Sequence, residues 1–250
     1  MKAISVYEKT TSFLWQHLLL VISMYVMTLG VALCVKSNFG SSVISAIPFV
    51  MTLAGNIGDV PQLTIGQYTY LMNAMLVVFQ ILILRRMFEP VQLFQLAVGF
   101  VFGFLLDANM ALLSWLSADS LITQTTVQLG GCLVLAVGIS LEIRCSSVTM
   151  PGEGITVAVC RASRIPFAKA KIFVDITMVT CAIILGYIFF GTWQWNVVGP
   201  GTLIAMIFVG AAIKVIDPYM EWFSRLLHCS PAFQRHIYGL ARYIYHCFRS

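Results

Sequence analysis

One acidic residue stands in a sequence context suited to ligand chemistry. Glu153 lies between two glycines directly after Pro151, in the stretch Pro151-Gly-Glu-Gly154 of a strongly apolar chain. An ionisable group at membrane depth is costly unless it is paired or hydrated, and such a group is therefore a candidate functional residue. The functional interpretation is a carboxylate near the middle of the membrane that binds a proton or a ligand. The alternative is a carboxylate that stabilises the start of a short helix through the helix dipole.

Small hydroxyl residues occupy a comparable position earlier in the chain. Ser41, Ser42 and Ser45 lie at the start of a short apolar segment. Serine hydroxyls can hydrogen-bond a substrate, and the first turn of a half-length helix presents N–H groups to an anion. The alternative is that these small residues permit close helix packing. The predicted substrate-binding residues are Glu153, Ser41, Ser42, Ser45, Asn38 and Thr149.

Two further acidic residues lie within apolar runs and are candidates, with Glu153, for coupling to a proton or another ion. Asp107 follows a long apolar run and is expected near the outer interface. Asp175 lies four residues after Lys171, so the two side chains share one helical face and can pair with each other. The sequence leaves the coupling role and the structural role open for both residues.

Motifs of soluble enzymes are absent from the chain. The sequence has no phosphate-binding glycine loop, no GxGxxG, no GxSxG and no HExxH. The seven cysteines are scattered without metal-ligand spacing, and three of the four histidines lie in the last 25 residues or so. We therefore expect no enzymatic activity, no catalytic residues, no cofactor, no metal site and no nucleic-acid partner.

The composition indicates an integral membrane protein. Hydrophobic residues make up 59% of the 250 residues and charged residues only 10%, with a mean hydropathy of +0.89. Soluble domains average about 25% charged residues, so an ordinary soluble domain is excluded, as is a disordered chain. Six apolar runs are long enough to cross a bilayer. They are residues 13–35, 64–84, 91–117, 121–143, 172–191 and 198–223.

Two shorter apolar segments interrupt this series. One covers residues 41–55 and contains Pro48, and the other covers residues 150–160 and opens with Pro151. Both are too short for a comfortable crossing, so re-entrant half-helices fit them better. The predicted fold is an all-α polytopic membrane protein with about six transmembrane helices and two short re-entrant helices.

The distribution of basic residues predicts the orientation. With a cytoplasmic N-terminus and two segments that do not cross, thirteen of the fifteen lysines and arginines face the cytoplasm. Lys36 is then the one at an outer end, and Lys214 lies within the last span. Crossings by both short segments would weaken this bias, which is contrary to the positive-inside rule. We expect a multi-pass protein of the inner (plasma) membrane with both termini in the cytoplasm.

An internal repeat of about 108 residues supports this organisation. The stretch from Leu29 to Ser37 matches the stretch from Val137 to Cys145, with Gly30 on Gly138. Each copy is followed by one of the short segments. Three crossings per copy is an odd number, so the two copies run in opposite directions, as in many secondary transporters. We therefore predict one membrane domain, residues 1–230, with repeat one at about 13–117 and repeat two at about 121–224.

The glycine and proline motifs carry a family resemblance. The motifs are the span end Leu29–Lys36, residues 40–48, Pro151-Gly-Glu-Gly154, and Gly199-Pro-Gly-Thr202. Over residues 15–220 the chain resembles the bacterial YczE/YyaS/YitT group of small membrane proteins, which implies a bacterial membrane protein. That group would have a Pro-Arg-Asp-like triplet where this chain has Pro151-Gly-Glu153, so no role of an arginine carries over.

The last twenty residues form a separate feature. Basic residues recur at spacings of three and four in residues 231–250 and alternate with an apolar face. This pattern is typical of an amphipathic helix on an anionic membrane surface, and a docking segment for a protein partner is the alternative. The expected partners are the lipid bilayer, anionic lipids at this tail and a small solute. The sequence does not distinguish a monomer from a homo-oligomer.

Two functions of different classes fit these features. The first is a small bacterial secondary transporter or exporter of a small polar or anionic molecule, working by alternating access with a proton or ion as coupling partner. The second is a membrane accessory protein that scaffolds or regulates a partner without solute flux. The predicted contact of Glu153 with Ser41, Ser42 or Ser45 across a polar cavity would favour the first function, and a closed, fully packed contact would favour the second.

Overall fold

The fold consists of helices connected by short loops. The computed structural model describes residues 6–145, 150–220 and 222–223, and within these ranges it contains eight α-helices, three short 3-10 segments and no strand. The α-helices are α1 (Val6–Lys36), α2 (Val43–Ile57), α3 (Ile65–Leu84), α4 (Gln95–Leu112), α5 (Leu121–Arg144), α6 (Pro151–Ser163), α7 (Phe167–Phe190) and α8 (Pro200–Ile216).

Five of the described helical segments are long and apolar enough to cross a membrane. They contain α1, α3, α4, α5 and α7, with 20 to 24 residues in each spanning part. The protein is therefore a multi-pass membrane protein, as the composition predicts. Helix α8 is shorter than the predicted run of residues 198–223, because it has 17 residues and ends at Ile216. Pro218 explains this end, since the residue before a proline is disfavoured in helical conformation.

The two short helices are confirmed as separate elements. Helix α2 has 15 residues and contains Pro48, and helix α6 has 13 residues and begins at Pro151. Proline fits the first helical position because its missing N–H would have no partner there. Helix α2 ends at Gly58, whose φ of 91° is the left-handed conformation that glycine adopts without strain.

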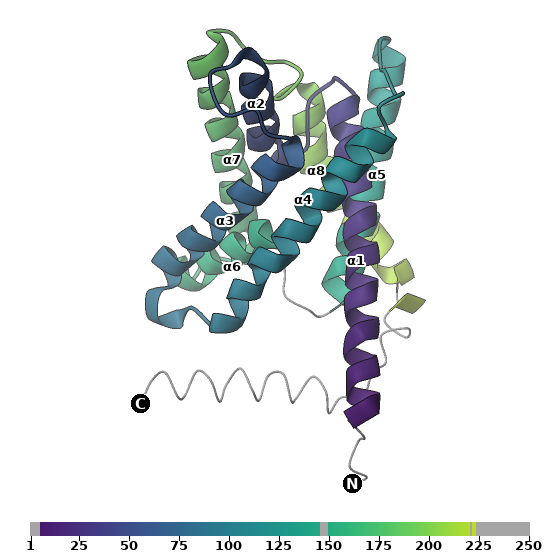
Figure 1. Cartoon of the computed structure of the whole chain (residues 1–250), viewed down its shortest axis with the longest axis vertical. Helices are drawn as coiled ribbons and strands as arrows, with labels where there is room; N and C mark the ends of the chain where they lie inside the picture. The colour runs from purple at the N-terminus through teal and green to yellow at the C-terminus, as the bar shows by residue number, and fades with distance from the viewer. Residues whose placement is uncertain (1–5, 146–149, 221, 224–250) are drawn as a thin grey trace.

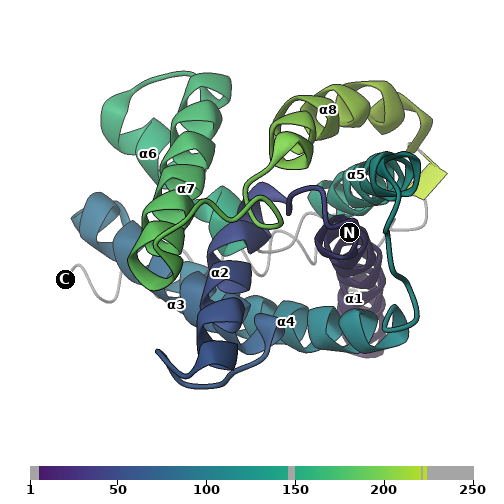
Figure 2. The ribbon, with the colours of Figure 1, turned by 90° about the horizontal axis from the view of Figure 1, so that it is seen from above.

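The helices form two groups around a central pair. Helices α1 and α5 pack along each other and run in opposite directions, with α4 on α1 and α8 on α5. The second group consists of α2, α3, α6 and α7, in which α2 packs on α3 and α7, and α6 packs on α7 and α3 (Figures 1 and 2). Helix α3 also packs along α4, whereas α7 does not pack along α8.

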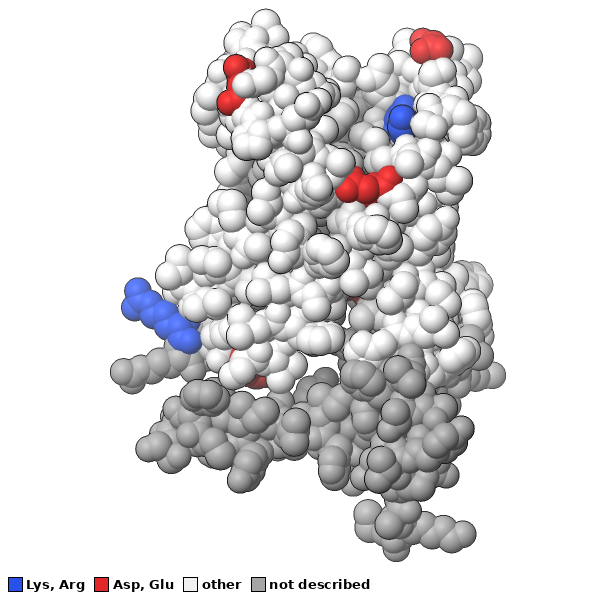
Figure 3. Space-filling view, in the orientation of Figure 1, with Lys and Arg blue, Asp and Glu red and all other residues white. Residues whose placement is uncertain are grey.

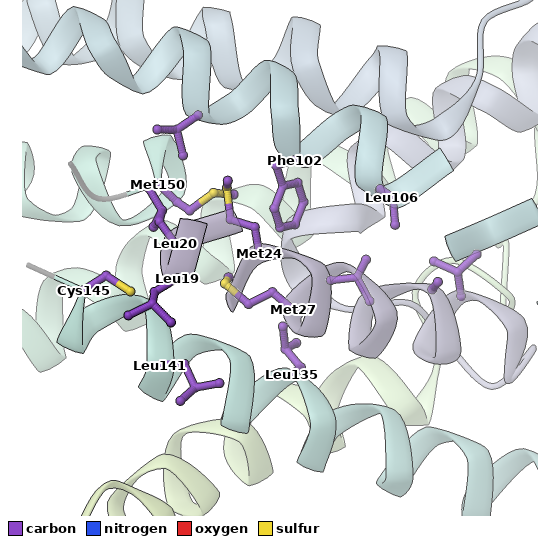
Figure 4. Close-up of a cluster of buried hydrophobic side chains, with 14 of the residues drawn as sticks. Leu19, Leu20, Met24, Met27, Phe102, Leu106, Leu135, Leu141, Cys145 and Met150 are labelled. Atoms are coloured by element: carbon purple, nitrogen blue, oxygen red, sulfur yellow. The ribbon is translucent and has the colours of Figure 1, made fainter. Parts of the chain in front are cut away.

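The largest apolar core lies where α1 meets α4 and α5. Figure 4 shows Met24 and Met27 of α1 between Phe102 of α4 and Leu135 of α5. The core extends to Cys145 and Met150, on either side of residues 146–149. The side chains come from elements far apart in sequence, so this core fixes α1, α4 and α5 relative to one another and to the start of α6.

Glycines set the distance between the two central helices. A Cβ atom on Gly30 of α1 would lie 2.4 Å from the backbone nitrogen of Leu135, and one on Gly138 of α5 would lie 2.6 Å from the backbone nitrogen of Met27. Both distances are too short for any side chain. Small residues permit such close backbone approach, which is a main source of stability between helices in membranes.

The described surface is suited to contact with lipid. Large apolar side chains are exposed along the spans, among them Phe104, Ile176 and Ile207. Figure 3 shows that the described part of one face is almost entirely uncharged, with a few charged groups only. A continuous apolar exterior of this extent is unusual in a soluble monomer, and it agrees with helices that are surrounded by a bilayer.

Candidate functional site

The start of α6 is the point at which buried polar side chains from three other helices meet. Helix α3 contributes Gln80, helix α4 contributes Gln95 and helix α5 contributes Glu142, and all three side chains are at least 96% buried, with exposures of 0%, 3% and 4%. Buried polar groups normally have hydrogen-bond partners. Their placement around one helix start makes this cluster, here named the α6 cluster, the candidate site.

Glu142 holds the first residue before α6. Its Oε1 atom accepts a hydrogen bond from the backbone N–H of Met150 at 3.1 Å. Its Oε2 atom is also buried but has no hydrogen-bond partner among the described residues. A buried carboxylate needs compensation for both oxygens, since loss of hydration costs several kcal/mol per charge. One oxygen of this side chain is thus satisfied by the fold and the other is available to a ligand.

Gln80 and Gln95 lie over the first turn of α6. The Nε2 atom of Gln80 donates to Oε1 of Gln95 at 3.0 Å and to the carbonyl oxygen of Pro151 at 3.1 Å. A Cβ on Gly154 would lie 2.7 Å from Oε1 of Gln80 and 2.7 Å from Nε2 of Gln95. Glycine at this position therefore gives the two amides room to approach the helix.

Glu153 belongs to the same cluster through its charge. This half-buried side chain in the first turn of α6 interacts electrostatically with Glu142, with Lys171 and with Asp175. Asp175 forms an ion pair with Lys171 at 2.9 Å, which confirms the predicted pairing across one helical turn of α7. The cluster thus combines three carboxylates and one lysine.

The position of this cluster differs from the expected centre of the membrane. Gln80 lies four residues before the end of α3, Gln95 begins α4, and Glu142 lies two residues before the end of α5. The same end of the molecule carries the early part of α1, since Nε2 of Gln16 donates to the carbonyl oxygen of Cys145 at 2.6 Å. The reason is that α6 begins only six residues after α5 ends.

The three predicted serines have partners elsewhere. Both the backbone N–H and the hydroxyl of Ser41 donate to the carbonyl oxygen of Val197, at 2.9 and 2.8 Å. The hydroxyls of Ser42 and Ser45 lie 2.8 Å apart and bond to each other. These bonds anchor the start of α2 to the segment before α8. The described contacts of the serines do not include Glu153.

The contact between the two short helices is apolar. A Cβ on Gly152 of α6 would lie 2.9 Å from Cδ1 of Ile44 of α2, and Ile44 packs with Ile155 in a cluster of buried apolar side chains. The polar groups near α2 and those near α6 are thus separated by apolar side chains. The polar cavity expected between Glu153 and the serines is not found among the described residues.

The remaining predicted residues lie outside the α6 cluster. Asp107 of α4 accepts hydrogen bonds from the hydroxyl of Thr64 at 2.5 Å and from the backbone N–H of Gly66 at 2.8 Å, so it caps the start of α3. Asn38 is exposed in the turn after α1 and adopts a left-handed φ of 56°. Thr149 lies outside the described residues, as does the predicted tail of residues 231–250.

Two further arrangements of polar groups are buried near the other end of the molecule. Gln128 of α5 accepts from the hydroxyl of Ser37 at 2.8 Å and donates to the carbonyl oxygen of Gly201 at 2.9 Å. The Sγ atoms of Cys34 and Cys132 lie 3.9 Å apart at the contact of α1 with α5. No group of three or more metal-ligating side chains was found in the part of the chain that the structure describes.

A small cavity lies at this same end, away from the α6 cluster. It is lined by Val50 of α2, by residues 182–187 of α7 and by residues 193–198. Its lining is mainly apolar and includes none of the predicted site residues. The cavity therefore offers shape without the charged groups that the α6 cluster provides.

Sequence analysis did not include Glu142, Gln80 and Gln95 among the site residues. Gln80 and Glu142 lie within long apolar runs, and a lone polar residue in such a run is a functional candidate by default. That rule would have drawn attention to both residues. Their convergence on α6 was not readable, because it depends on contacts between residues 71 apart in the chain.

The family comparison agrees with the extent of this membrane fold. Residues 14–218 match the model of a family described as a family of unknown function, DUF6198. The chain belongs to this family. The match covers all eight α-helices except the start of α1, including every described residue of the α6 cluster. No curated protein and no solved structure matches the chain, so this DUF6198 protein has no relative from which an activity can be transferred.

Proposed function

We propose that this DUF6198 protein is a small secondary transporter that moves a small polar or anionic molecule by alternating access. The observation that carries the proposal is the α6 cluster, in which three spans direct buried polar groups at the start of a half-length helix. Polar groups within a membrane protein are costly, and they mark substrate and ion sites more often than packing sites. Discontinuous helices at such sites are typical of secondary transporters.

The packing of the helices supports two inverted repeats. An offset of about 108 residues places Gly30 on Gly138 and Met27 on Leu135. The close contact of Gly30 with Leu135 is thereby converted into the close contact of Gly138 with Met27, and both occur. A chance likeness between apolar sequences would not produce reciprocal contacts. We infer six crossings, formed by α1, α3, α4, α5, α7 and α8, with α2 and α6 re-entrant.

The packing between helices also follows the repeat, with one exception. Helix α2 packs on α7 as α6 packs on α3, and α4 packs on α1 as α8 packs on α5. The exception is that α3 packs along α4, whereas the equivalent helices α7 and α8 lie apart. Two equivalent interfaces in different states are what alternating access requires, because the two repeats exchange conformations during a cycle.

A labelling experiment tests the orientation. The positive-inside rule places residues 85–90 in the cytoplasm and residues 113–120 outside. In a cysteine-free background, Asp119→Cys should react with an impermeant maleimide added to intact cells, and Glu89→Cys should react only after the cells are opened. Both native side chains are exposed, so access within the protein is equal. The reverse labelling pattern would contradict the orientation.

A flux measurement tests the function itself. The purified protein is reconstituted in vesicles that contain a pH-sensitive dye, and gradients of small organic anions and neutral polar solutes are imposed in turn. We expect at least one solute to drive proton movement above the level of protein-free vesicles. The accessory hypothesis predicts no flux with any solute in vesicles that retain folded protein. Such a result would contradict the transport function.

A further inference from the structure

The unpartnered atoms of the α6 cluster are oxygens. Oε2 of Glu142 and Oε1 of Gln80 are buried without a hydrogen-bond partner among the described residues. The orientation of the Gln80 amide is fixed, because the carbonyl oxygen of Pro151 can only accept and therefore requires Nε2. Both remaining atoms are thus acceptors, and only a hydrogen-bond donor or a positive charge can satisfy them.

These two oxygens flank the same short stretch of backbone. Oε1 of Glu142 bonds the N–H of Met150, and Nε2 of Gln80 bonds the carbonyl oxygen of Pro151, which is the next residue. The side chains reach this stretch from α5 and α3. Glu142 and Gln80 are 4% and 0% exposed, so bulk water does not solvate their free oxygens.

The charge balance around the cluster favours a cation over an anion. The Asp175 carboxylate is paired with Lys171 at 2.9 Å, which leaves Glu142 and Glu153 to repel each other. A buried carboxylate that faces a second carboxylate is costly unless a proton or another cation neutralises it. An anionic ligand would add to this repulsion.

We propose that the start of α6 binds a monovalent cation, a proton or a sodium-sized metal ion, between Oε2 of Glu142 and Oε1 of Gln80. A proton on Oε2 would be donated in a hydrogen bond to Oε1 of Gln80, so a single proton satisfies both oxygens. A sodium ion would be shared between the same two atoms. The inference deepens the proposed function, on which it rests, by naming the coupling ion.

Few other titratable groups act on Glu142. Glu153 interacts with it from α6, and Cys145 adjoins it at the end of α5. Burial raises the pKa of the Cys145 thiol to about 11, so this thiol carries no charge at neutral pH. The remaining groups on the helices packed around α5 and α6 are His17, which lies against Phe94, the Lys171–Asp175 pair, the exposed Lys214 and the exposed Tyr219.

The test measures binding without transport. The melting temperature of the purified full-length protein is recorded while sodium chloride replaces choline chloride at constant ionic strength and pH. If the cation is sodium, each tenfold rise in sodium above the dissociation constant should raise the melting temperature by roughly 3 to 6 °C. If it is a proton, sodium has no effect, and the melting temperature in choline chloride rises as the pH falls from about 8 to about 5.

Glu142→Gln should abolish whichever response the wild type shows. Glu89→Gln is the matched control, because it removes the same charge from an exposed ion pair with Arg161 at 3.7 Å, and it should keep the full response. If Glu142→Gln does not fold, Gln80→Met serves instead and should lower the apparent affinity at least tenfold. A wild type without either response, or variants that respond as the wild type does, would overturn the proposal.

The outcomes separate this inference from the proposed function. A cation response without flux of any solute would contradict transport and leave the cation site in place. Flux without any cation or pH response of the melting temperature would contradict the site and leave transport in place.

Discussion

Replacement of Glu153 by glutamine is expected to reduce solute-driven proton movement in vesicles to the level of protein-free vesicles. Glutamine has nearly the same size but carries neither charge nor a transferable proton. Glu153 is half-buried in the first turn of α6 and interacts with Lys171, Asp175 and Glu142. It therefore connects the ion pair of α7 with the buried carboxylate of α5, and its loss interrupts any proton movement between them.

The same variant should leave the fold intact. A half-buried carboxylate at a helix start contributes about 0.3–1 kcal/mol through the helix dipole, so the melting temperature should stay within a few degrees of the wild-type value. Glu89→Gln is again the control and should transport normally, since an exposed ion pair contributes little. Normal transport by Glu153→Gln with an unchanged pH profile would show that the coupling role is wrong. An unfolded variant would show that the carboxylate is a structural cap.

The sequence was sufficient to predict the elements that carry local signals. The long apolar runs predicted the spanning helices, and Pro48 and Pro151 marked the two short helices that the structure contains. The pairing of Lys171 with Asp175 followed from their spacing alone. In each case the physical cause lies within a few residues, such as a missing N–H, the length of an apolar run or one helical turn.

The partners of the polar residues could not be predicted in the same way. Ser41 bonds Val197, a residue 156 positions away, and Asp107 caps α3 across 41 to 43 positions. A serine at a helix start has the same local sequence whether it faces a ligand or a distant carbonyl group. Glu142 was recognised as needing a partner, but its orientation toward Met150 depends on the path of residues 146–149. The candidate site therefore moved from the contact between α2 and α6 to the contacts of α6 with α3, α4 and α5.

Replacement of either central glycine by alanine is expected to destabilise the protein by about 3 kcal/mol. The new Cβ would lie 2.4 Å from a backbone nitrogen in Gly30→Ala and 2.6 Å from one in Gly138→Ala. Backbone cannot rotate away as a flexible side chain can, so α1 and α5 must separate and lose contacts along the crossing. Unfolding in detergent, followed by circular dichroism or by the reactivity of buried cysteines, measures the effect.

Gly130→Ala supplies the matched control on the same helix. A Cβ at this position has no atom within 4 Å, so the variant should be neutral or gain up to about 1 kcal/mol from the higher helix propensity of alanine. If Gly30→Ala were as stable as Gly130→Ala, the close crossing would be wrong. The double variant Gly30→Ala/Gly138→Ala adds a test of the repeat. Because both glycines serve one crossing, helices already separated by the first alanine accommodate the second at lower cost, and the double variant should lose less stability than the two single losses combined.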